Sequence, residues 1–219
     1  MNYIKTKWRE LSTILLGLCI VIGRVLLPTI YGVNQTIVVL ELSIEIIICV
    51  GVIFLNKEKI AKIKENAKND KLGKFLLKSF TTAIIMILSG IIFGNVVPLV
   101  FKSDNVLLGI ISKFSTILPF LGFISQVIVA PITEELVFRM TIRDLIPNKF
   151  LFVIISAALF AFIHDWFYFS AGLPYYFLMG IMFALLYLYK NKDIRYMIAG
   201  HSMTNILAAI FQALSKMHM

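Results

Sequence analysis

Long, continuous apolar stretches dominate the chain, and short polar connections separate them. Each stretch is close to the ~20 residues that an α-helix needs to cross a hydrocarbon core about 30 Å thick. Because the apolar residues are continuous rather than alternating, they favour membrane-spanning helices over half-buried strands. The pattern predicts seven spans, at Leu11–Tyr31, Thr36–Leu55, Phe75–Phe101, Pro119–Leu145, Phe150–Phe169, Leu173–Tyr189 and Ile194–Leu214.

Composition points to the same class. The 219 residues are 59% hydrophobic and 15% charged, with a mean hydropathy of +0.90, whereas soluble domains are about 45–50% apolar and about 25% charged. We therefore expect an all-α integral membrane protein, a polytopic bundle that forms a single membrane-embedded domain over residues 1–219. Between the third and fourth spans, the apolar stretch Asp104–Leu118 is too short to cross and predicts an interfacial or re-entrant segment.

Basic residues mark one side of this bundle. Most of the 21 lysines and arginines lie before the first span, in the Lys-rich connection after the second, at the end of the fourth and after the sixth. If the spans alternate, all four places fall on one side, and Lys and Arg collect on the cytoplasmic side of short loops. We expect a cytoplasmic N-terminus and an external C-terminus in a bacterial plasma membrane. The net charge of +9 then indicates contact with anionic membrane lipid rather than nucleic acid.

Two further sets of polar residues have structural interpretations. The segment Asn56–Lys78 is either an amphipathic helix on the inner leaflet or a solvated connection. Glu41 and Glu45 share one face of the second span, and Arg24 of the first span could pair with either. We interpret these three residues as a structural ion pair.

The fourth span carries two adjacent carboxylates, Glu134 and Glu135, which packing alone does not explain. An ionisable side chain inside the bilayer costs several kcal/mol, so it is a functional candidate. Arg139 follows Glu135 by four residues, the spacing of an intrahelical ion pair. Such a pair would neutralise Glu135 and leave Glu134 as a candidate general base. A purely structural network of all three residues is the alternative.

Two histidines also lie within predicted spans. His164 is in the fifth span, and His201 is in the seventh, where Asn205 follows it by four residues on the same helix face. A single intramembrane histidine would usually be a packing residue. Two histidines on separate helices, with an asparagine and a carboxylate pair, instead predict convergence on one polar cavity.

These motifs resemble the CAAX protease and bacteriocin-processing family of intramembrane proteases, also called the CPBP or Abi family. The order E-E-x-x-x-R, F-x-x-x-H and H-x-x-x-N occurs at Glu134, Glu135 and Arg139, at Phe160 and His164, and at His201 and Asn205. The resemblance covers the core at residues 119–214. Met140 departs from it, because the family often has glycine after the arginine.

The resemblance implies an intramembrane endopeptidase, a hydrolase in which Glu134 and His164 activate water and His201 and Asn205 stabilise the oxyanion. Glu135, Arg139 and Phe160 would support the site. The family has also been interpreted as metal-dependent, as a metalloendopeptidase. Zinc bound by Glu134, His164 and His201 is therefore an alternative to a cofactor-free site, although asparagine is a poor zinc ligand and no H-E-x-x-H motif occurs.

The resemblance implies a membrane-associated protein or peptide as substrate. Short cytoplasmic loops and the absence of soluble domains suit the bacterial members, which favours processing of bacteriocins or signalling peptides, or a role in bacteriocin immunity. A proton-coupled transporter and an idle family member that regulates a membrane partner are the alternatives. Counting about 1.5 Å per residue from the helix ends places Glu134, His164 and His201 at unequal depths of about 16, 21 and 10 Å. Their convergence therefore requires tilted helices.

Overall fold

The computed structural model contains helices and no strands among the residues that it describes, which are 2–21, 27–32, 34–68, 70–101, 119–165 and 172–217. Its elements are α1 (Asn2–Val21), α2 (Leu27–Tyr31), α3 (Gln35–Leu55), α4 (Lys57–Asn66), α5 (Leu72–Phe101), α7 (Pro119–Ile124), η2 (Ser125–Val129), α8 (Ala130–Glu134), η3 (Glu135–Thr141), α9 (Ile142–Leu145), α10 (Lys149–Asp165), α11 (Gly172–Tyr189) and α12 (Ile194–Met217). The all-α prediction is confirmed.

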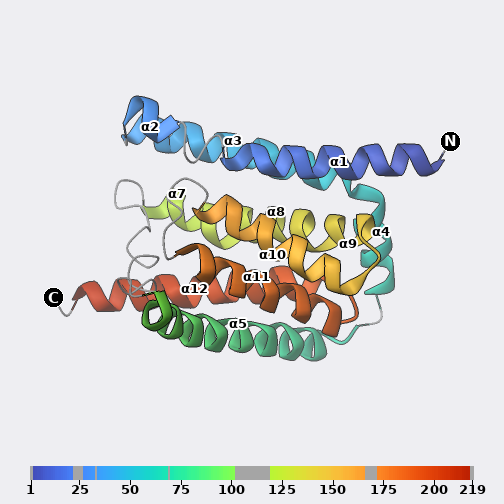
Figure 1. The fold of residues 1–219 in the computed structure, drawn as a ribbon. Coiled ribbons are helices and arrows are strands. Elements are labelled where there is room, and N and C mark those ends of the chain that lie inside the picture. Colours follow the sequence, from blue (N-terminus) through green and yellow to red (C-terminus); the bar gives the residue numbers. More distant parts are fainter. Residues whose placement is uncertain are drawn as a thin grey trace.

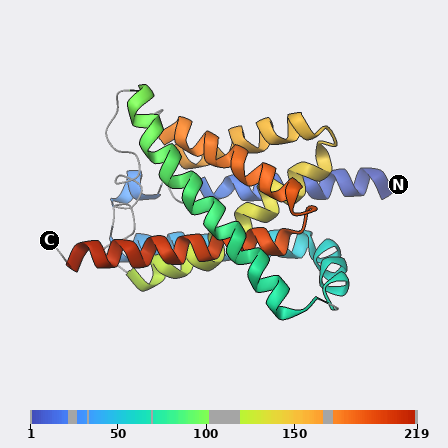
Figure 2. The same ribbon diagram turned by 90° about the horizontal axis from the view of Figure 1, so that it is seen from below.

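The long helices run back and forth along one common direction (Figure 1). α1 and α3 pack together on one side of the bundle, while α5 and α12 pack together on the other. The continuous rod from α7 to α9 lies between them, beside α10 and α11. Viewed from below, α5 crosses its neighbours obliquely (Figure 2). The elements that carry the motifs, α8, η3, α10 and α12, are therefore neighbours within one bundle.

Length and hydropathy identify four candidate membrane spans among the described residues, at Gln35–Leu55, Leu72–Val100, Phe120–Leu145 and Gly172–Tyr189. The predicted count of seven is not confirmed. α10 has 17 residues, which is about 26 Å of helix and close to the minimum for a span. Polar side chains lower the hydropathy of α12, and the first half of α1 is charged. Both the predicted segment Asp104–Leu118 and Arg24, the proposed partner of Glu41 and Glu45, lie outside the described residues.

The rod from α7 to α9 matches the predicted fourth span, but it is not a uniform α-helix. η2 and η3 are π-helical, so backbone N–H groups there bond to the carbonyl five residues back. The Ala130 N–H, for example, donates to the Ser125 carbonyl. π-Helical turns are uncommon and often lie at functional sites. Glu134 and Glu135 occupy the junction between α8 and η3.

Small residues allow the central helices to approach closely, as is common in membrane bundles. A Cβ atom at Gly180 of α11 would lie 2.7 Å from the Ala157 Cα of α10. A Cβ atom at Gly200 of α12 would lie 2.6 Å from the Thr82 Cγ2 of α5. Since both distances are below van der Waals contact, glycine is required at these crossings. The second crossing positions the helix that carries His201.

The basic connections gather at one end of the bundle, the end that also holds the N-terminus (Figure 1). The predicted segment Asn56–Lys78 is divided between two helices. Lys57–Asn66 forms the short helix α4, and the end of the segment belongs to α5, which begins at Leu72. Ile60 and Ile63 of α4 pack against the hydrophobic core. Lys59 forms ion pairs with Glu10 of α1 and Asp144 of α9. α4 therefore folds against the bundle and is not a solvated connection.

A second set of contacts joins the α4–α5 connection to the start of α12. The guanidinium group of Arg195 lies 2.6 Å from the Asp70 carboxylate and 2.7 Å from the Asp193 carboxylate. The hydrogen bond from Arg195 holds the pKa of Asp70 below its usual value. The two basic connections are thereby held next to each other.

Single cysteines at Asn66 and Ser215, in a variant without Cys19 and Cys49, are expected to react with membrane-impermeant maleimide from opposite sides of the membrane. The reason is that an odd number of crossings separates α4 from the end of α12 if each long helix spans. Labelling of sealed inverted vesicles and of intact cells measures the sidedness. Reaction of both positions from the same side would contradict the alternating arrangement.

Candidate functional site

The two adjacent carboxylates lie in the protein interior. Glu134 retains 4% of its accessible surface and Glu135 retains none. Because consecutive helical residues point about 100° apart, the two side chains face different neighbours. Glu134 faces His164 of α10, whereas Glu135 faces His201 of α12 and Arg139 of its own helix.

His164 is held with a defined tautomer beside Glu134. Its Nδ1 lies 2.7 Å from the Phe160 carbonyl oxygen. A carbonyl only accepts, so Nδ1 carries a proton and donates it. Nε2 lies on the other side of the ring, 3.8 Å from Glu134 Oε1. Both groups are therefore within reach of one shared water, because each side of such a bridge needs about 2.8 Å.

The imidazole ring of His164 is held against two aromatic rings. Its centroid lies 4.2 Å from that of Phe160 and 4.5 Å from that of Tyr176, which stacks on it. The histidine side chain keeps 18% of its surface accessible. Its orientation is therefore restricted, while its edge stays open to a small molecule.

Glu135 connects three groups in the centre of the bundle. His201 Nδ1 lies 3.0 Å from Glu135 Oε1, so the imidazole donates to the carboxylate. Arg139 Nε lies 3.5 Å from Glu135 Oε2, as the spacing in the sequence predicts. The structure thus places His201 on Glu135 rather than on Glu134. The predicted residues form two adjacent pairs, and the backbone between Glu134 and Glu135 joins them.

The guanidinium group of Arg139 is completely buried between aromatic faces. Its central carbon lies 4.6 Å from the Phe160 ring centroid and 5.1 Å from the Phe183 ring centroid. Cation–π contacts of this kind strengthen when they are desolvated. Among the described residues, none of its three nitrogens has a hydrogen-bond partner in good geometry. Glu135 and the two rings therefore provide its charge compensation.

Asn205 lies one turn further along α12 than His201. Its Nδ2 donates to the Gln126 carbonyl in η2, at 2.7 Å. The amide is therefore anchored to the rod that carries both glutamates, and not to a side chain. Phe160, predicted as a supporting residue, lies between Arg139 and His164 and contacts both.

The unequal depths expected for Glu134 and His164 do not separate them. Their side chains meet at 3.8 Å although they lie at different residue counts from the end of the bundle where the α7–α9 rod finishes and α10 begins (Figure 1). Residue counts on two helices can be compared as depths only if the helices have the same tilt and begin at the same level. The helices here are inclined to one another (Figure 2). Tilts of 20–40° are ordinary in membrane bundles.

The residues do not form a three-ligand metal site. Among the described residues, no group of three His, Cys, Asp or Glu side chains lies close enough to hold a metal ion. Of the three predicted ligands, Glu134 and His164 lie beside each other, whereas His201 contacts Glu135 instead. A catalytic zinc site needs three protein ligands that converge on one point, and this donor set does not fit it.

Three parts of the site were not predicted from the sequence. Tyr176 and Phe183, which contact His164 and Arg139, are aromatic residues in an apolar helix and look like ordinary core. They are seven residues apart, so they share one face of α11. The third part is the Gln126 carbonyl, a backbone group. Pro131, five residues later, is the one sequence feature that accounts for its availability.

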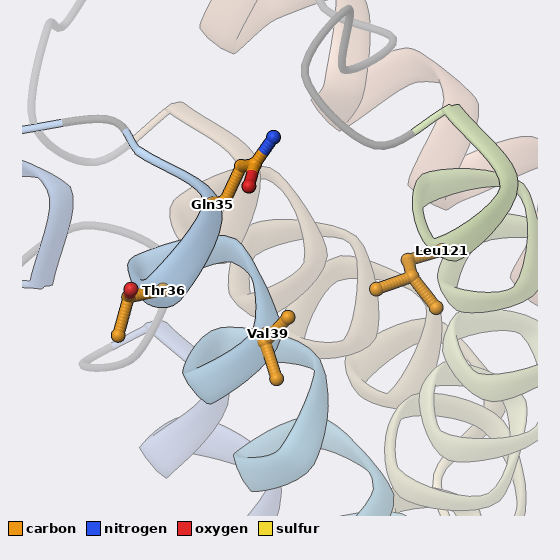
Figure 3. A pocket seen from close by; sticks show the side chains of 4 residues that line it. All are labelled: Gln35, Thr36, Val39 and Leu121. Atoms are coloured by element: carbon orange, nitrogen blue, oxygen red, sulfur yellow. The ribbon is translucent and has the colours of Figure 1, made fainter.

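A pocket lies apart from these residues, at the end of the bundle away from α4. It has a volume of about 490 Å³, and its described lining consists of Gln35, Thr36 and Val39 of α3 and Leu121 of α7 (Figure 3). None of the motif residues lines it. The site is therefore defined by its side-chain contacts and not by this pocket.

Comparison with known families agrees with the resemblance seen in the motifs. Residues 116–207 match the family model described as type II CAAX prenyl endopeptidase Rce1-like. This segment contains all seven motif residues, and the predicted resemblance is confirmed over it. No curated protein and no solved structure matches the chain.

Arg139→Ala is expected to lower the free energy of unfolding by about 3–5 kcal/mol, because it leaves the Glu135 carboxylate buried with one partner fewer. Glu58→Gln is the control, since Glu58 forms an exposed ion pair with Arg9, and such pairs contribute about 0–1 kcal/mol. Unfolding in mixed micelles measures both. Equal losses in the two variants would show that Arg139 has no special role.

Proposed function

We propose that the protein is an intramembrane endopeptidase that hydrolyses a peptide bond of a membrane-associated protein or peptide. The family match supports a protease role in the membrane. The observation that carries the proposal is the pair formed by Glu134 and His164, two groups able to accept a proton. They are held 3.8 Å apart, with Glu134 buried and His164 partly exposed.

Glu134 and His164 would activate the attacking water. The Phe160 carbonyl accepts a hydrogen bond from the Nδ1–H of His164. In the neutral ring the Nε2 atom therefore has no proton and accepts a hydrogen bond from water. Glu134 would take the proton as general base and deliver it to the leaving amine. The rings of Phe160 and Tyr176 keep the imidazole in the orientation that this step requires.

His201 and Asn205 would stabilise the oxyanion that forms when water attacks the peptide carbonyl. His201 already donates through Nδ1 to Glu135, so a second donation through Nε2 requires the doubly protonated ring. Glu135 compensates that charge. Asn205 uses one amide N–H for Gln126, and its second N–H would reach the oxyanion. Donors that are fixed before the reaction are often the largest contribution to such catalysis.

The proposed reaction contains no metal-dependent step, because the donor set does not converge on one point. Glu135 and Arg139, with Phe160, would hold the shape of the site and leave the acid–base work to Glu134. Substitution of Glu135 or Arg139 would lower activity partly by lowering the stability of the fold, because it leaves the other charge unpaired.

For the substrate, we propose a membrane-associated peptide in a bacterial plasma membrane, in the processing of bacteriocins or signalling peptides or in self-immunity. A prenylated peptide with a C-terminal CAAX sequence is the first probe, because the description of the matching family names this substrate. The positive-inside rule would put the basic end of the bundle in the cytoplasm, which fits a substrate that approaches from that side.

Glu134→Gln is expected to lower turnover by about 10²–10⁴-fold, because the amide keeps the shape of the side chain but does not accept a proton. Cleavage of fluorogenic prenylated and unprenylated peptides in proteoliposomes measures it. Glu41→Gln, the same change on α3 outside the site, is the control and should retain activity. Full turnover by Glu134→Gln would exclude the proposed base. Full biological function of this variant in cells would favour the partner-binding role over the protease.

Chelators are expected to leave turnover unchanged, since the proposed water activation depends on Glu134 and His164 alone. The measurement compares initial rates before and after dialysis against a strong chelator, and again after addition of zinc. Loss of activity on dialysis with recovery in zinc would contradict the metal-free site and would favour the zinc alternative.

A further inference from the structure

A backbone carbonyl is left without its helical partner where η2 passes into α8. In η2 the Ala130 N–H donates five residues back, to the Ser125 carbonyl. The next carbonyl, that of Gln126, would accept in the same pattern from residue 131. Residue 131 is proline, which has no N–H. The π-helical turn and Pro131 together therefore release the Gln126 carbonyl.

Asn205 of α12 supplies the missing donor. Its Nδ2 lies 2.7 Å from the Gln126 carbonyl oxygen, and a carbonyl only accepts. This contact therefore fixes which end of the amide is the nitrogen. It also fixes the direction of the remaining N–H.

The segment that offers this carbonyl is itself held from the other side. The hydroxyl of Ser125, the residue before Gln126, donates to the carboxylate of Glu45 on α3, and Glu45 is buried. η2 thus connects α3 to α12 through two neighbouring residues, one by its side chain and one by its backbone. This arrangement restricts movement of the Gln126 carbonyl away from Asn205.

We infer that Pro131 is a positioning residue for Asn205: by having no N–H it keeps the Gln126 carbonyl available, and that carbonyl orients the amide that donates to the oxyanion. The catalytic part of this inference rests on the proposed function. The anchoring part does not, because it concerns a hydrogen bond within the folded protein.

The anchor is tested by the melting temperatures of a double-mutant cycle in detergent micelles. Asn205→Ala leaves the Gln126 carbonyl buried without a donor, so it should lower Tm in the otherwise unchanged protein. In a Pro131→Ala background residue 131 has an N–H that takes the carbonyl, so the same Asn205 change should lower Tm less. Since both proteins compared in the Pro131→Ala background lack the proline ring, its lost packing cancels.

Pro98→Ala is the matched control background, because Pro98 also lies inside a long helix, α5, and is not part of the site. There the Tm loss from Asn205→Ala should equal that in the unchanged protein. Equal losses in all three backgrounds would overturn the inference. If Pro131→Ala does not fold, Pro131→Ser supplies the same N–H and replaces it.

Turnover gives the second readout. Asn205→Ala should lower kcat by about 10²–10³-fold. Pro131→Ala should lower it by up to about 10²-fold through misorientation of the amide, with little change in KM, and Pro98→Ala should not lower it. In the Asn205→Ala background, Pro131→Ala should have no further effect on kcat, whereas independent losses that multiply would overturn the positioning role. If the unchanged protein hydrolyses nothing beyond the level of Glu134→Gln, the proposed function fails, and the Tm cycle alone decides the anchor.

Discussion

The buried Glu135 carboxylate is the contact on which the centre of the structure depends. It accepts from His201 of α12 at 3.0 Å and faces Arg139 of its own helix at 3.5 Å. A charge at this depth is costly unless it is paired, and the Arg139 guanidinium has two aromatic rings as its other neighbours. One carboxylate therefore contacts an imidazole and a guanidinium group, and it joins two helices. Its neighbour Glu134 is left to face His164.

The π-helical segments extend the same constraint to the backbone. In a bilayer every backbone polar group must find a partner within the protein, and a change from α to π pairing displaces carbonyls from their usual donors. Side chains replace those donors. Asn205 donates to Gln126, and Ser156 of α10 donates to the Phe138 carbonyl of η3 at 2.7 Å. The irregular rod is thus held by the helices that contribute His164 and His201.

The sequence predicts the class of the protein better than it predicts the geometry of the site. Long apolar runs are enough to predict a helical bundle, and the spacing of Glu135 and Arg139 is enough to predict their contact, since helical periodicity links sequence to space directly. The sequence placed His164 and His201 in one cavity but did not show that they pair with different carboxylates. Helix tilt and rotation decide that pairing, and no local pattern encodes them. Tyr176 and Phe183 are equally hard to predict because they resemble ordinary aromatic core residues. The Gln126 carbonyl is a backbone group, and only Pro131 marks it in the sequence.

The central claim is that this bundle hydrolyses peptide bonds with a water activated inside the membrane. Its most direct test is digestion of membrane-associated peptides by the reconstituted protein in oxygen-18 water, followed by mass spectrometry of the products. The account predicts new C-termini that carry the heavy oxygen in the carboxyl group formed from the attacked carbonyl. Absence of such labelled termini, or the same labelling with Glu134→Gln, would contradict it.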